Sequence, residues 1–146
     1  MDKIITIENK KDEKFLRRKT EEFDFSAQGG SAPGGEKFSK KEINELIMRM
    51  RKAMHKAQGI GLSANQIGLD LRLFVAEVAD GKHKSTKFYA VFNPKIEKMI
   101  GEKISFSEGC LSVPLTYGEV ERPERIVLSG CDKNAQPIKI KAWGLL

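Results

Sequence analysis

A single long segment with helical period, residues 39–57, most constrains what this chain can fold into. Ser39 and Glu42 have the S-x-x-E spacing of a capping box, in which two side chains satisfy free N–H groups of the first helical turn. Apolar side chains then recur at helical spacing along one side, namely Ile43, Leu46, Ile47, Met50 and Met54. We therefore predict an amphipathic helix that ends near Gln58-Gly59, where glycine can take a left-handed conformation.

Beyond residue 70 the apolar period changes to that of strands. The segments with this pattern are 71–78, 88–92, 103–106, 126–131 and 138–142. A polar turn at 80–85 is expected to join the first two, and Pro94 is expected to close the second. The last two should pair as a hairpin across 132–137. One long helix against mainly antiparallel strands predicts an α+β fold, in a single domain over residues 1–146.

The segment before the helix is rich in glycine. Residues 26–35 contain four glycines and a proline, a composition that favours coil. We therefore expect a flexible surface loop over 26–37. Four apolar residues upstream are expected to attach the charged N-terminal stretch to the core: Phe15, Leu16, Phe23 and Phe25.

Composition excludes several classes of protein. The chain has 146 residues, of which 40% are apolar and 32% charged, enough for a sizeable globular core. No apolar run approaches the ~20 residues of a membrane-spanning helix. The N-terminus has too short an apolar stretch for a secretory signal and is followed by too many acids for a mitochondrial transit peptide. We therefore expect a cytoplasmic location and no membrane partner.

The formal net charge is +6. Basic clusters at 17–19 and 40–41 can attract a polyanion such as ribosomal RNA. No combination of aromatic and basic residues accompanies these clusters in the sequence, so a solvated basic surface is favoured. An RNA- or ribosome-associated protein remains an alternative, and no DNA partner is expected.

Two short motifs carry the candidate chemistry, and the first is Gly59–Gln66. Glycines at positions i and i+2 let the backbone turn sharply and lie close to a ligand, although such a pair alone is usually just a turn. Gln66 offers a neutral amide donor that can stabilise a developing oxyanion, although an isolated glutamine is more often a loop residue. The glycines follow a helix and lack G-x-G-x-x-G spacing, which argues against dinucleotide binding.

The second motif is Glu108–Ser112, which contains one of the two cysteines. Cys110 can be a metal ligand, a nucleophile or an inert residue, and an isolated cysteine is more often inert. A Cys-His nucleophile has little support, because the only histidines are His55 in the long helix and His83 in a polar turn. Cys131 ends an apolar run and is expected to be a small buried hydrophobe, without a disulfide framework.

Together and in this order, the two motifs resemble the first two signature motifs of peptide deformylases. These are metallohydrolases that remove the formyl group from nascent formyl-methionyl chains. The resemblance extends over other segments of the chain, namely 15–18, 39–57, 93–94, 120–126 and the final hairpin. The glycine-rich loop resembles an insertion into the family pattern.

The resemblance implies a role for each motif residue. Cys110 would bind a metal through its thiolate, commonly Fe(II) in the family, with Zn, Ni or Co as alternatives. Gln66 and the backbone N–H of Leu111 would stabilise the oxyanion formed when metal-bound hydroxide attacks the formyl carbon.

The resemblance also implies how a formyl-methionyl peptide would bind. Backbone groups near Ile60, Gly61 and Gly109 would hold the peptide in an extended, strand-like pose. The methionine side chain would enter a neighbouring apolar pocket.

A third family motif, a His-Glu-x-x-His helix, follows a segment ending in Gly-Leu-Leu. This sequence ends at Gly144-Leu145-Leu146. We therefore expect the metal-binding helix to be missing, the domain to be incomplete at its C-terminus and the chain to be inactive. The lost burial would remove roughly 6–12 kcal/mol of stability, if four apolar side chains lose their cover. The alternative function is a non-catalytic peptide-binding or ribosome-associated module with a deformylase-like fold.

Overall fold

The structure is a computed structural model, and it describes residues 3–26, 28–79 and 85–144. In chain order the elements are α1 (Lys10–Leu16), β1 (Asp24–Ser26), β2 (Gly29–Ser31), β3 (Lys37–Ser39), α2 (Lys40–Lys56), β4 (Gly61–Ser63), the 3-10 helix η1 (Ala64–Ile67), β5 (Leu73–Ala79), β6 (Thr86–Cys110), β7 (Val113–Cys131) and β8 (Pro137–Trp143). No helix in these ranges is long and apolar enough to cross a membrane.

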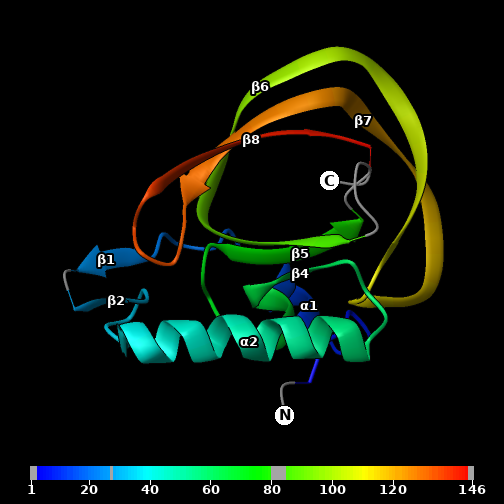
Figure 1. Cartoon of the computed structure of the whole chain (residues 1–146). Helices are drawn as coiled ribbons and strands as arrows, with labels where there is room; N and C mark the ends of the chain where they lie inside the picture. Colours follow the sequence, from blue (N-terminus) through cyan, green and yellow to red (C-terminus); the bar gives the residue numbers. More distant parts are fainter. Residues whose placement is uncertain (1–2, 27, 80–84, 145–146) are drawn as a thin grey trace.

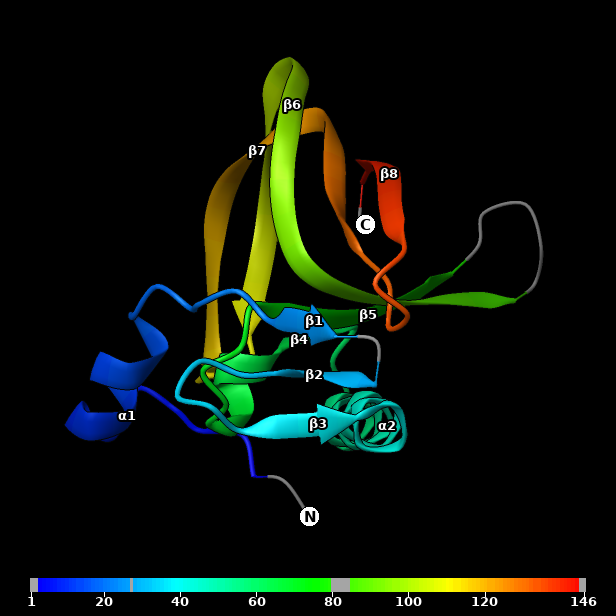
Figure 2. The same ribbon diagram turned by 90° about the vertical axis from the view of Figure 1, so that its left-hand side faces the viewer.

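The strands of the described residues form two antiparallel sheets, with the orders β1-β2-β3 and β4-β5-β6-β7-β8. Helix α2 contacts β3, β4 and β5 and lies beneath β4 and β5 in Figure 1. The long strands β6 and β7, with β8 beside β7, curve away from the helix as an arch (Figures 1 and 2). The predicted α+β class with mainly antiparallel strands is confirmed.

Helix α2 begins as the sequence predicts. The Ser39 hydroxyl accepts from the Glu42 backbone N–H at 3.3 Å, and the Glu42 carboxylate accepts from the Ser39 backbone N–H at 2.8 Å. The left-handed residue at its end is Gln58, with φ of 57°, so the expectation of a left-handed glycine there is wrong. Gly59 serves close packing instead, because an added Cβ would lie 2.6 Å from Leu111 Cδ1.

The apolar side of α2 forms the main core. All five residues of its predicted apolar stripe are buried, together with Phe23, Phe92 and residues of β4 and β5. Phe25 packs edge-on against both Phe23 and Phe92, which confirms that this segment is attached to the core. Phe15 and Leu16 are half-buried on α1, which contacts η1. Cys131 is half-buried against the core.

The coil predicted across the glycine-rich segment is wrong for residues 29–31, which form strand β2. Gly29 and Gly30 pair with β1 on one side and β3 on the other. Both glycines are buried, and a Cβ on Gly30 would collide with the Phe23 ring. Glycine is therefore needed here because a large ring lies against the strand, a requirement that composition alone did not reveal.

Strand β6 is longer than predicted. It continues through Pro94 to Cys110, so the boundary expected at Pro94 is wrong. Pro94 falls within a register shift between Phe92 and Lys95, a place where a proline without an N–H is tolerated. The predicted strand at 103–106 lies within β6, and the predicted hairpin of 126–131 with 138–142 is confirmed as β7 and β8. Residues 80–84 of the predicted turn lie outside the described residues.

Candidate functional site

The two sequence motifs meet in space. Gln66 lies in η1, directly after β4, and Cys110 ends β6. The Gln66 side-chain amide donates to Ser112 Oγ at 3.1 Å and lies 3.7 Å from Cys110 Sγ. The fold therefore brings together an amide donor and a thiol that are 44 positions apart in the sequence.

The amide of Gln66 is held from both ends. Its Oε1 accepts from the Ser63 backbone N–H at 2.9 Å, which directs the NH₂ group towards Cys110 and Ser112. Ser112 is 3% exposed, so its hydroxyl is a fixed acceptor. Sequence reasoning assigned no role to Ser112, although its position inside the second motif was a signal.

The N-terminal segment joins the two halves of this site. The Ile5 N–H donates to the Gln66 carbonyl at 2.9 Å, and the Ile7 N–H donates to the Ser112 carbonyl at 3.0 Å. One short segment before α1 thus ties the backbone of both motifs. Nothing in the composition of residues 3–7 pointed to this contribution, because it depends on contacts with residues far along the chain.

The thiol itself is open to solvent. Cys110 is exposed and lies at a register shift between β6 and β7, while the neighbouring Leu111 is half-buried. The side chain of Leu111 packs against the Gly59 backbone, at the distance that excludes a Cβ there. This contact places the start of the first motif next to the second.

The residues expected to bind a peptide are all exposed. Strand β4 is an edge of the five-stranded sheet, with Gly61 opposite Ala76 and exposed Ile60 just before it. Gly109 pairs with Tyr117, and a Cβ there would lie 2.9 Å from the Tyr117 ring. An edge strand leaves unpaired backbone groups that can add a further extended segment.

A carboxylate–guanidinium pair precedes Cys110 on β6. Glu108 accepts from Arg122 Nε at 2.9 Å and from Nη2 at 2.7 Å. The hydrogen bonds from Arg122 hold the pKa of Glu108 below its usual value, so this carboxylate is ionised at neutral pH. Glu108 therefore ties β6 to β7 rather than serving as a proton donor.

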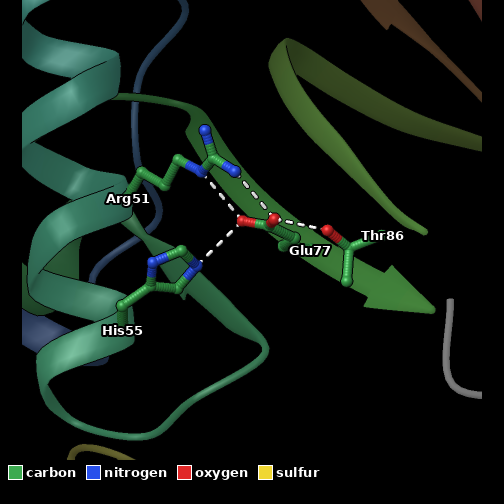
Figure 3. Close-up of polar contacts among 4 residues, drawn as sticks. All are labelled: Arg51, His55, Glu77 and Thr86. Carbon is green, nitrogen blue, oxygen red and sulfur yellow. Dashed lines mark hydrogen bonds and ion pairs between the residues drawn. The ribbon is translucent and has the colours of Figure 1, made fainter. Parts of the chain in front are cut away.

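A second polar cluster lies where α2 meets β5 and β6 (Figure 3). The Glu77 carboxylate accepts from Arg51 Nε and Nη2 at 2.8 and 2.7 Å, from His55 Nε2 at 2.8 Å and from Thr86 Oγ1 at 2.8 Å. The hydrogen bonds from Arg51, followed by the one from Thr86, lower the pKa of Glu77 to about 2. His55 lies in α2 and bonds to Glu77, so it is not a partner of Cys110.

The Glu77 cluster also supports the edge strand. The Glu77 backbone N–H donates to the Ile60 carbonyl at 2.8 Å. The same residue thus holds the end of α2 through its carboxylate and the start of β4 through its backbone. The connection over 57–60, which contains the start of the first motif, is therefore fixed at both ends.

The described residues do not fit a metal ion by themselves. They contain no group of three or more His, Cys, Asp and Glu side chains that could hold one. Cys110 provides one thiolate, Glu108 is paired with Arg122, and His55 is bonded to Glu77. His83 lies outside the described residues. A catalytic zinc site normally has three protein ligands and one open position.

Comparison with known proteins gives a consistent result. The family model described as polypeptide deformylase matches residues 3–146. The peptide deformylase 2 of Gloeobacter violaceus is 37% identical over 105 residues, covering 72% of this chain and 56% of the relative. The peptide deformylase of Psychrobacter cryohalolentis is 39% identical over 105 residues, covering 72% of this chain and 55% of the relative. The matches thus cover little more than half the length of these relatives.

Solved structures share the fold. A probable peptide deformylase from Synechococcus phage S-SSM7 superimposes with a TM-score of 0.80 at 36% identity, covering 99% of this chain and 86% of that one. A peptide deformylase from Synechococcus elongatus, in complex with actinonin, gives 0.76 at 29% identity, covering 98% and 66%.

Proposed function

The chain belongs to the polypeptide deformylase family, and from this premise we propose that it acts in removing the formyl group from formyl-methionyl peptides. The observation that carries the proposal is the approach of the Gln66 amide to Cys110, with Ser112 holding that amide in place. These three residues come from two motifs that are far apart in the chain. A purely structural pair of loops has no need for an amide donor directed at an exposed thiol.

Gln66 is proposed to stabilise the transition state. Attack on the formyl carbon turns it tetrahedral and places negative charge on its oxygen, and a fixed neutral donor stabilises that charge. The contacts of Gln66 with Ser63 and Ser112 hold its NH₂ group beside Cys110, which supports this role. The backbone N–H of Leu111, next to Cys110, is proposed as the second donor.

The peptide is proposed to lie along β4. Ile60 and Gly61 occupy an edge strand, which can pair with an extended segment through backbone hydrogen bonds. Gly109 is proposed to approach the peptide through its backbone from the end of β6, where the Tyr117 ring packs against it. The exposed position of Ile60 supports this arrangement.

Cys110 is proposed as one ligand of the family's metal, Fe(II) or alternatively Zn, Ni or Co. Because the described residues supply this single thiolate, we derive no chemical step through a metal. A polypeptide made of these 146 residues alone is therefore proposed to bind a formyl-methionyl peptide without turning it over. A ribosomal partner and a cytoplasmic location stay predictions.

A second candidate function follows from the same observation. The edge strand and the amide donor are present, whereas the metal set of the described residues is incomplete. A non-catalytic peptide-binding module would retain this combination. The two functions differ in whether added metal ligands restore turnover.

One experiment separates them. The 146-residue protein and a fusion to the C-terminal segment of the phage relative are each tested with a formyl-methionyl tripeptide and Fe(II) under anaerobic conditions. We expect peptide binding by both proteins and turnover by the fusion alone, abolished by Cys110→Ala. A fusion that folds and binds the peptide but never turns it over supports the binding module. If both proteins fold and neither binds the peptide, both candidate functions are contradicted.

A further inference from the structure

One face of the β6–β7–β8 arch carries a concentration of positive charge that the sequence order does not reveal. Alternate residues of a strand share a face, and residues directly opposite on neighbouring strands lie on the same face. The pairs of β7 with β8 on this face are Ser129 with Lys139, Val127 with Lys141, and Arg125 with Trp143.

Strand β6 extends the same rows. Lys95 lies opposite Ser129, and Lys98 lies opposite Val127. Two rows therefore cross the three strands, Lys95–Ser129–Lys139 and Lys98–Val127–Lys141, and each row has a lysine at both ends. We call this surface the basic sheet face, and its members are Lys95, Lys98, Arg125, Lys139, Lys141 and Trp143.

The charge of this face is only partly compensated. Glu97 lies 3.7 Å from Lys95 Nζ, and Glu124 lies 3.6 Å from Arg125. Within the described part of the chain, no acid lies at ion-pair distance from the other three members, Lys98, Lys139 and Lys141. Two of the five cations on this face therefore have an acid within ion-pair distance.

Trp143 supplies an aromatic ring among these cations. Its side chain is 67% exposed, and it lies opposite Arg125 and two positions from Lys141. The opposite face of the same strands carries buried Ala142 and half-buried Leu128 and Ile140. The exposed ring is therefore not part of the core of these strands.

We propose that the basic sheet face binds single-stranded RNA, with phosphates on the lysine rows and one base stacked on Trp143. Surfaces that bind single strands combine a positive track for the backbone with aromatic side chains that stack on bases. A membrane surface fits less well, because membrane-surface binding elements bury a whole apolar face, and this face offers one ring. The choice of RNA as the polyanion rests on the proposed function, because that function acts on nascent chains. The positive charge and the exposed ring of this surface do not depend on that function.

The chain contains a single tryptophan, so its fluorescence reports this face directly. A 12-nucleotide unstructured RNA is titrated into the 146-residue protein at several salt concentrations. We expect quenching of Trp143 on binding. We also expect the logarithm of the binding constant to fall with the logarithm of salt with a slope of about −3, as for four or five contacts to single-strand phosphates.

Charge-reversal variants localise the binding. Lys98→Glu with Lys141→Glu should weaken RNA binding at least tenfold. The matched control, Lys40→Glu with Lys41→Glu, changes the net charge equally in the first turn of α2, and should weaken it less than twofold. A helix accepts acids in its first turn, so the control should remain folded.

The ring is tested with a fluorescently labelled RNA and anisotropy. Trp143→Ala should weaken binding at least fivefold, and Trp143→Phe should restore it to within twofold, because stacking needs a ring and not an indole. Equal thermal unfolding of the two variants shows that the loss is not a loss of fold.

Several results would overturn the proposal. These are RNA binding without quenching, an equal loss in the control pair, equal affinity for the matching single-stranded DNA, or a response to anionic phosphatidylserine vesicles in place of RNA. The assay does not use the Gln66–Cys110 site, so Cys110→Ala should leave RNA binding unchanged. Failure of deformylation and failure of RNA binding are thus separate outcomes.

Discussion

At the scale of single residues, Gln66 and Cys110 are expected to act at different steps. In the fusion protein of the activity test, Gln66→Leu should lower kcat by about 10²–10³, the usual effect of deleting an oxyanion donor, while leaving metal content intact. Cys110→Ser should lower metal content, because it removes a thiolate ligand. The measurements are kcat and metal per protein. An unchanged kcat in Gln66→Leu would remove Gln66 from the mechanism.

Gly59 gives a second prediction at the same scale. Gly59→Ala would place a Cβ 2.6 Å from Leu111 Cδ1, so Leu111 or the 57–60 connection must move. We expect the free energy of unfolding to fall by about 1–3 kcal/mol, as in other overpacked sites.

The matched control for Gly59→Ala is Gly118→Ala on β7. No atom lies within 4 Å of a Cβ built at Gly118, and its φ is not in the left-handed region. Its effect on the free energy of unfolding should stay within about 0.5 kcal/mol. Urea unfolding of both variants checks this, and equal effects would show that contact with Leu111 is not the cause.

At the scale of elements, the Glu77 carboxylate joins α2, β5 and β6 (Figure 3). Its pKa is lowered from 4.5 to about 2, so the folded state favours the ionised form. The stability contributed by this carboxylate is fully present above pH 4.5 and is lost as the pH falls towards 2. Glu77→Gln should therefore lower the free energy of unfolding at neutral pH. It should also weaken the dependence of that free energy on pH between 4.5 and 2.

The control for this prediction is Glu45→Gln on the same helix. Glu45 is exposed and lies 3.8 Å from Lys41, a geometry that contributes little to stability. The free energy of unfolding is measured by chemical unfolding at pH 7, 4.5 and 3. Its dependence on pH should be weaker in Glu77→Gln than in the unmodified protein and unchanged in Glu45→Gln. The same pH dependence of the free energy of unfolding in both variants would mean that the Glu77 cluster does not stabilise the fold through its charge.

At the scale of the whole molecule, the apolar face of the arch is poorly covered. Met99 is 64% exposed, Ile96 48% and Ile104 42%, and their cross-strand partners place all three on the face opposite the basic sheet face. Exposed apolar patches of this kind favour association. We expect the 146-residue protein to be weakly stable or to self-associate.

A synthetic peptide with the family's His-Glu-x-x-His helix should dock on this apolar face and raise the melting temperature by mass action. The measurements are size-exclusion chromatography and thermal unfolding, with and without the peptide. A scrambled peptide of the same composition is the control. A monomeric protein with a sharp transition at high temperature, unaffected by the peptide, would show that the fold needs no such cover.

Local features of the fold could be predicted from the sequence, because they depend on residues only a few positions apart. The capping box of Ser39 and Glu42 and the apolar stripe of α2 are contacts between residues three or four apart. The alternation within β5 and β8 likewise needs only neighbouring residues. The two motifs that indicate the family are each short and continuous.

Contacts between distant segments were decided by the tertiary structure alone. Ser112 holds Gln66, Glu77 holds Ile60, and Gly30 lies against the Phe23 ring. The rows of the basic sheet face depend on the register of three strands, so lysines that are scattered in the sequence become neighbours. The sequence determined the local elements and the family, because periodicity and motifs are local. The register and the packing brought together the rest, because a one-residue shift in pairing would have placed those side chains on the other face.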